Sequence, residues 1–110
     1  MNSQRKGQKA ENELANKLQS LGFNTWRSSA MYETGQDAPD IDGIEGLHVE
    51  CKRVEKLNLS AAMSQSENDA RCHEIPCVMH RKNREAWQVT VKLHDLHRLA
   101  EIINTQEVTV

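Results

Sequence analysis

Apolar residues recur at helical spacing in three segments of the chain, which we expect to be helices. In residues 7–22 the apolar positions share one face, and Gly22 is placed to end the helix. These positions are Ala10, Leu14, Leu18 and Leu21. Residues 60–72 form the second segment, with Ser60 as the expected N-cap. Residues 94–104 form the third, with their leucines and isoleucines on one side.

Five shorter segments have the composition and the polar–apolar pattern of β-strands. They are residues 23–29, 40–44, 47–54, 75–81 and 86–93. A polar loop over residues 30–38 follows the first strand, and the polar turn at residues 82–84 joins the last two. The predicted order of elements is therefore α-β-β-β-α-β-β-α.

This order limits the topology. Three consecutive strands favour an antiparallel meander, and the strand–helix–strand connection that follows returns the fourth strand parallel to the third by a right-handed crossover. We therefore expect an α/β fold with a central mixed sheet flanked by helices. At 110 residues the chain has the size of one domain, so we expect residues 1–110 to form a single domain.

The hairpin predicted at residues 39–53 carries charges that strand propensity disfavours. Side chains of its second strand alternate between two faces. The expected core face carries Leu47, Val49 and Cys51. The opposite face carries His48, Glu50 and Lys52. The pattern therefore places an acid and a lysine side by side on one surface.

The register of this hairpin follows from the apolar residues. Ile41 joins the core face if it pairs with Val49, which requires a loop of odd length. Residues 44–46 supply a three-residue loop, with Gly46 at the left-handed position that such loops need. The same register places Asp40 directly across from Glu50, with their Cβ atoms about 5 Å apart.

Two adjacent carboxylates repel each other unless a cation lies between them. Oxygen ligands from Asp40 and Glu50 suit Mg²⁺ or Mn²⁺, and Lys52 on the same face can orient a water or neutralise charge on a phosphate. A solvated outer face, on which Lys52 merely offsets the acids, is the alternative. Asp42 would face His48 on the same side and competes with Asp40 as a ligand.

Charge is unevenly distributed along the chain. The net charge is −2, yet basic residues cluster at positions 5, 6 and 9 and again at positions 81, 82 and 84, which favours binding to phosphates. No apolar run approaches the roughly 20 residues that cross a bilayer, and residues 1–20 lack a signal-peptide core. We therefore expect a cytoplasmic protein, from a bacterial or phage-infected host cell, with no membrane partner.

Pro39-Asp40, followed after nine residues by Glu50-Cys51-Lys52, resembles the PD-(D/E)XK motif of the restriction-endonuclease-like nuclease superfamily. Residues 5–28 are similar to the opening helix and first strand of archaeal-type Holliday junction resolvases and their phage-encoded relatives. The matching positions are Lys6-Gly7, Glu11, Gly22-Phe23 and Arg27. Residues 75–91 resemble the fourth and fifth strands of that group. Asn12 departs from it, because arginine often stands beside the helix glutamate there.

The resemblance implies a metal site of Glu11, Asp40 and Glu50, holding Mg²⁺ or Mn²⁺, with Lys52 as the catalytic lysine. Glu11 borders the apolar stripe of its helix, as this role requires, whereas Glu13 is expected to point away; a first-turn acid that stabilises the helix dipole is the other interpretation of Glu11. The expected contacts to DNA are Lys6, Lys9, Arg27, Arg53, Gln65, Arg81, Lys82 and Arg84.

The function that the resemblance implies is a metal-dependent DNA endonuclease that resolves four-way junctions and leaves a 5′-phosphate and a 3′-hydroxyl. Two symmetric nicks need two such sites, so we expect a homodimer, with the last strand or the last helix as the contact surface. Three alternatives stay open: a nuclease of this fold acting on other DNA structures, a non-catalytic nucleic-acid-binding module, and an unrelated interaction protein.

Overall fold

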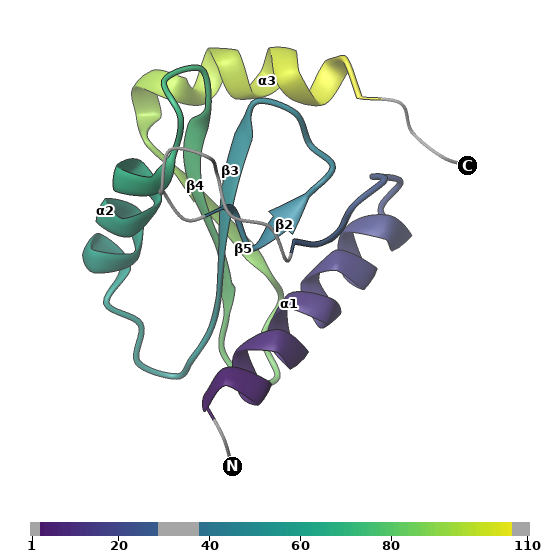
Figure 1. The fold of residues 1–110 in the computed structure, drawn as a ribbon, viewed down its shortest axis with the longest axis vertical. Helices are drawn as coiled ribbons and strands as arrows, with labels where there is room; N and C mark the ends of the chain where they lie inside the picture. Colours follow the sequence, from purple (N-terminus) through teal and green to yellow (C-terminus); the bar gives the residue numbers. More distant parts are fainter. Residues whose placement is uncertain (1–2, 29–37, 107–110) are drawn as a thin grey trace.

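The computed structural model describes residues 3–28 and 38–106, and its elements follow the predicted order (Figure 1). The helices are α1 (Ser3–Ser20), α2 (Leu59–Asp69) and α3 (Leu96–Asn104), the last preceded by a 3₁₀ turn η1 (Leu93–Asp95). The strands are β1 (Trp26–Arg27), β2 (Ile41–Asp42), β3 (Leu47–Arg53), β4 (Ile75–Arg81) and β5 (Gln88–Val91). Most of the predicted loop at residues 30–38 lies outside the described residues.

The five strands form one mixed sheet in the order β1-β2-β3-β4-β5. The pair β3–β4 is parallel and the other three pairs are antiparallel, which confirms the predicted α/β fold. Ile41 pairs with Val49, as the hydrophobic pattern predicted. Gly46 has a φ of 89° in the hairpin loop, the left-handed conformation expected there.

The helix ends are set by short-range hydrogen bonds. Helix α1 ends before Gly22, whose φ is 102°, and the Phe23 N–H donates to the Leu18 carbonyl at 3.0 Å, as in a Schellman motif. The predicted N-cap Ser60 of α2 is wrong. Asn58 is the cap, because its side-chain oxygen accepts from the Ala61 N–H at 3.1 Å and the helix already begins at Leu59.

Helices cover both faces of the sheet (Figure 1). Helix α1 and the inner side of α3 pack on the face of Leu47, Val49 and Cys51, which forms the main core. Helix α2 packs on the opposite face through Ala62 and Met63. The alternative that this second face of β3 is solvated is therefore wrong. The crossover helix α2 buries His48 and Glu50, which are 0% and 3% exposed.

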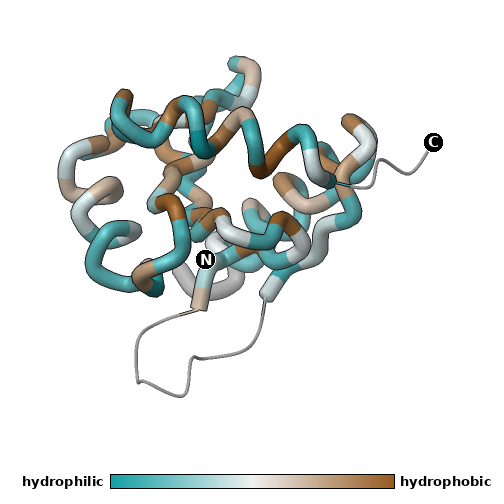
Figure 2. Tube along the Cα trace, turned by 90° about the horizontal axis from the view of Figure 1, so that it is seen from above, coloured by the Kyte–Doolittle hydropathy of each residue, from teal (hydrophilic) through white to brown (hydrophobic). Residues whose placement is uncertain are grey.

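Helix α3 covers the main core only in part. Leu99 and Ile102 pack against the core, whereas Leu93 and Leu96 are 84% and 54% exposed. Figure 2, drawn from the α3 side, shows hydrophobic and hydrophilic positions following one another along this helix. No helix among residues 3–28 and 38–106 is both long and apolar enough to cross a membrane.

Candidate active site

Asp40 lies at the point where the pairing of β2 with β3 ends. Its N–H donates to the Val49 carbonyl at 2.8 Å, and its Oδ2 accepts from the Cys51 N–H at 2.8 Å. The carboxylate thus takes the place of a strand carbonyl for Cys51, which fixes its position against β3. The Asp40 carboxyl group also interacts with that of Glu50, both through charge and through a side-chain hydrogen bond. The structure therefore brings together the two acids that the register placed side by side.

The surroundings of Asp40 favour its protonated form. Burial contributes most, and the negative charges of Glu50 and Glu11 add to it, so that the pKa of Asp40 rises from 3.8 to about 7 despite the hydrogen bond from Cys51. A divalent cation would reverse this effect, because it favours the charged carboxylates. The donor set therefore fits a cation with a preference for oxygen ligands, such as Mg²⁺ or Mn²⁺.

The raised pKa predicts how the stability of the metal-free protein depends on pH. Between about pH 4 and pH 7 the folded protein keeps a proton on Asp40 that the unfolded chain has released. The free energy of unfolding should therefore fall as pH rises through this window, by on the order of 2 kcal/mol. Urea unfolding in EDTA at about pH 5 and about pH 8 measures the fall, and Asp40→Asn should lack this part of it. An equal fall in Asp40→Asn would contradict the prediction.

Glu11 approaches this pair from α1 and is held by an arginine of the first strand. Its Oε2 accepts from Arg27 Nε at 2.9 Å, and its charge acts on Asp40. Ligand atoms of Glu11, Asp40 and Glu50 do not form a compact group of three in the described part of the chain. The structure therefore joins Asp40 with Glu50 and leaves Glu11 beside them, paired with Arg27.

Lys52 follows Glu50 by two residues on β3, so that both side chains lie on the same face of the strand. Lys52 is half-buried, and its Cα pairs with that of His80 on β4. The structure thus has an acid pair, Asp40 and Glu50, with Lys52 two residues after Glu50 on β3.

The sequence model of the archaeal Holliday junction resolvase (Hjc) family matches residues 2–108, nearly the whole chain. The chain belongs to the archaeal Holliday junction resolvase family. Among solved structures, Hjc from the archaeal hyperthermophile Archaeoglobus fulgidus, titled a Holliday junction resolvase, is similar with a TM-score of 0.57 and 25% identity. That match covers 78% of this chain and 72% of the other. No curated protein matches the sequence.

Family membership confirms the resemblance drawn from the motif and from the opening helix. It makes the chain a nuclease of the restriction-endonuclease-like superfamily, and the five-stranded mixed sheet agrees with the fold of the A. fulgidus protein.

Three of the basic residues expected to contact DNA are bound by acids of α1 in this family member. Arg27 pairs with Glu11, while Glu13 pairs with Arg53 at 3.2 Å and with Arg81 at 2.6 Å. Glu13, which was expected to point away from the apolar stripe of α1, is half-buried and contacts two arginines at the ends of β3 and β4. The other expected contacts are exposed: Lys6, Lys9, Gln65, Lys82 and Arg84.

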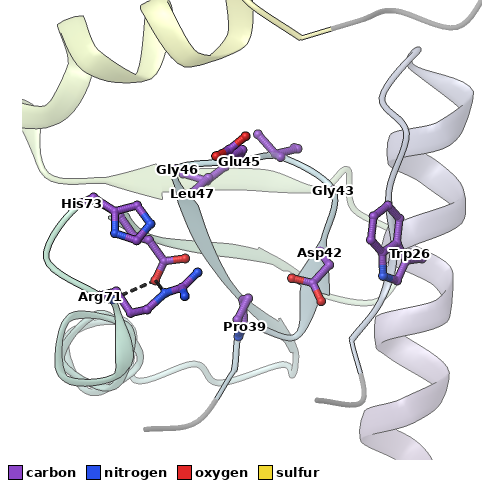
Figure 3. Close-up of a pocket in the computed structure, with 11 residues that line it drawn as sticks. Trp26, Pro39, Asp42, Gly43, Glu45, Gly46, Leu47, Arg71 and His73 are labelled. Carbon is purple, nitrogen blue, oxygen red and sulfur yellow. Dashed lines mark hydrogen bonds and ion pairs between the residues drawn. The ribbon is translucent and has the colours of Figure 1, made fainter. Parts of the chain in front are cut away.

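The competing acid Asp42 lies in different surroundings from Asp40. It points into a pocket of about 340 Å³ at the end of the sheet, which Trp26 and Pro39 also line (Figure 3). On the far side of this pocket, Arg71 forms an ion pair of 3.6 Å with Glu74. Asp40 and Asp42, on either side of Ile41, thus lie in different surroundings.

Three polar residues around Glu50 have no role that the sequence pattern predicts. They are His48, for which the pattern predicts only the face, and Asp69 and Glu74. His48 Nε2 lies 3.1 Å from Glu50 Oε1, and its Nδ1 lies 3.7 Å from Glu74 Oε1. Alternation along β3 signals the His48–Glu50 contact, whereas Asp69 and Glu74 reach this place only through the docking of α2 and the loop after it.

Proposed function

We propose that this resolvase cuts four-way DNA junctions with Mg²⁺ or Mn²⁺ held by Asp40 and Glu50, with Glu11 as the third acid, and with Lys52 as the catalytic lysine. The observation that carries the proposal is the pairing of a half-buried Asp40 with a buried Glu50, whose mutual repulsion either a proton on Asp40 or a bound cation relieves. Membership of a family of junction resolvases supplies the reaction and the substrate class.

Each residue has a defined task in this proposal. When bound, the cation would polarise the scissile phosphate and make a water more acidic. Asp40 is fixed by the Cys51 N–H, so its second oxygen keeps a constant direction toward the ligand position. Lys52 orients the attacking water and stabilises the negative charge that develops on the phosphate during in-line attack. Arg27 balances the charge of Glu11 until a cation does so.

DNA is held by the basic residues around this site. Lys82 and Arg84 lie exposed in the turn between β4 and β5, and Lys6 and Lys9 lie exposed at the start of α1. Arg53 and Arg81 are shared with Glu13, so they bind phosphate in competition with this acid. Such contacts position the duplex arms and carry no sequence information.

Two chains are needed to nick both strands of a junction, and the exposed apolar side chains near α3 are the surface that we assign to the second copy. Leu93 and Leu96 are 84% and 54% exposed, and Ile103, also on α3, is 42% exposed. Several exposed apolar side chains on and just before one helix favour a protein contact. A two-fold pairing through this surface would place two sites on one junction.

Leu96→Asp should convert the dimer into a monomer, because it buries a charge in the contact. Sedimentation equilibrium measures the mass, and we expect the value of one chain where the wild type gives two. Val54→Asp is the matched control, since Val54 is also exposed (41%) but lies after β3. An unchanged mass in Leu96→Asp, or an equal change in Val54→Asp, would move the dimer contact elsewhere.

One incubation tests the function itself. Purified protein is mixed with a labelled four-way junction, a plain duplex and a single strand, each with and without Mg²⁺. We expect cleavage of the junction alone, on two symmetric strands and only with Mg²⁺. Equal cutting of other DNA would indicate a nuclease of this fold with a different substrate. Binding of the junction without cleavage when Mg²⁺ is present would indicate a non-catalytic module and refute the proposal.

A further inference from the structure

A second group of possible metal ligands lies on the α2 side of Glu50. One ligand atom each from His48, Glu50 and Asp69 lies within 4.8 Å of the others. His48 and Glu50 are 0% and 3% exposed, and Asp69 is half-buried at the last position of α2. This group contains neither Asp40 nor Glu11. It therefore forms a separate ligand set, which shares only Glu50 with the acid pair of Asp40 and Glu50.

The distances within the group suit coordination. Two ligands bound to one ion at about 2.1 Å and at right angles are about 3.0 Å apart. His48 Nε2 and Glu50 Oε1 are 3.1 Å apart, which is the length of such an edge. Asp69 offers a second carboxylate within 4.8 Å of these two atoms, so a shift of its side chain toward them would complete a set of one nitrogen and two oxygen ligands.

A carboxylate lies on the far side of the imidazole, where a metal-ligating histidine usually has a hydrogen-bond acceptor. Such a histidine almost always donates its other ring N–H to a carboxylate or a carbonyl, which fixes the tautomer and the ring direction. Glu74 Oε1 lies 3.7 Å from His48 Nδ1, an ion-pair distance that must shorten by a few tenths of an ångström to become this hydrogen bond. Glu74 is itself held by the Arg71 N–H at 2.7 Å and by the Arg71 guanidinium at 3.6 Å. Each ring nitrogen of His48 therefore faces a carboxylate: Nε2 faces Glu50 and Nδ1 faces Glu74.

The helix that carries Asp69 is fixed to the strand that carries His48. Ser66 Oγ is fully buried and lies 3.1 Å from the carbonyl oxygens of both His48 and Cys77, and it accepts from the Cys77 N–H at 3.0 Å. Asp69 follows Ser66 by three residues and so lies on the same side of α2. The hydrogen bonds of Ser66 thus fix the position of Asp69 relative to β3.

We propose that His48, Glu50 and Asp69 bind a divalent transition-metal ion, at a site that shares Glu50 with the acid pair but needs neither Asp40 nor cleavage of DNA. One imidazole nitrogen with two carboxylates suits Zn²⁺ or Mn²⁺ and is a poor match for Mg²⁺, which prefers oxygen alone. The simpler interpretation is a buried imidazole–carboxylate hydrogen bond with no ion, and the experiment separates the two.

Mn²⁺ is the probe, added to the metal-free protein and followed by electron paramagnetic resonance. We expect a bound Mn²⁺ whose pulsed spectrum shows coupling to an imidazole nitrogen. The coupling should be lost in His48→Gln and kept in His97→Gln, which removes an exposed imidazole beside Glu101. Asp69→Asn should weaken this binding at least about tenfold, while Glu67→Gln on the same helix leaves it unchanged.

Asp40→Asn separates this site from the one proposed for catalysis. The nitrogen-coupled Mn²⁺ should persist in that variant even if it no longer cuts DNA. Absence of nitrogen coupling in the wild type, or equal Mn²⁺ affinity in Asp69→Asn and Glu67→Gln, would overturn the inference. If His48→Gln does not fold, the wild-type spectrum and the Asp69→Asn titration still decide it. Failure of junction cleavage would count against the proposed function and leave this result unaffected.

Discussion

Lys52→Ala should lower the rate of junction cleavage by about 10²–10³-fold or more while the protein still folds and binds the junction. Lys52 shares its face of β3 with Glu50, and its amine is the group that we assign to the attacking water and to the charge growing on the phosphate. It contributes little to the core, because the apolar side chains of β3 lie on the opposite face.

Single-turnover cleavage with excess protein measures the rate, and fluorescence anisotropy with labelled junction measures binding. Lys56→Ala is the matched control, since Lys56 is an exposed lysine just after β3. We expect Lys56→Ala to cleave at nearly the wild-type rate. Cleavage by Lys52→Ala within a few-fold of the wild type, or an equal loss in Lys56→Ala, would show that Lys52 is not the catalytic lysine.

Asp40→Asn and Asp42→Asn should differ sharply, although the two residues stand on either side of Ile41. Asp40 accepts from the Cys51 N–H and lies beside Glu50, so its amide variant loses a charged ligand at the proposed metal site. We expect a loss of about 10²–10³-fold in cleavage. Asp42 points into the pocket beside Trp26, and its variant should lose no more than a few-fold.

The dependence of cleavage on Mg²⁺ concentration sharpens this comparison. Part of the loss in Asp40→Asn should be recovered as Mg²⁺ is raised, because the weakened site then fills. Asp42→Asn should keep the wild-type Mg²⁺ dependence. An equal loss in the two variants would mean that the register of the hairpin does not determine the ligands.

Local features of this fold could be predicted from the sequence. The pairing of Ile41 with Val49 follows from the alternation of apolar residues together with a three-residue loop, both of which are properties of neighbouring residues. The end of α1 follows from Gly22 alone. The closeness of Asp40 and Glu50 is predictable for the same reason, because it depends on the register of one hairpin.

Features that depend on distant segments could not be predicted. Nothing near Glu50 in the sequence shows that α2 covers it, and an alternating strand is equally compatible with an open face. The direction of Glu13 is unpredictable for the same reason, since its partner Arg81 lies 68 residues away in the chain. The group of His48, Glu50 and Asp69 joins a strand to a helix end, so only the packed structure reveals it.

The acids of α1 also set how strongly this protein should respond to ionic strength. Binding to DNA weakens with salt in proportion to the counterions that basic side chains displace from the phosphates. Arg27 pairs with Glu11, and Arg53 and Arg81 share Glu13, so each arginine must leave a carboxylate before it binds a phosphate. The affinity for DNA should therefore decline less steeply with salt concentration than the number of surrounding arginines and lysines suggests. Binding to a junction should persist at a higher salt concentration than that number would allow.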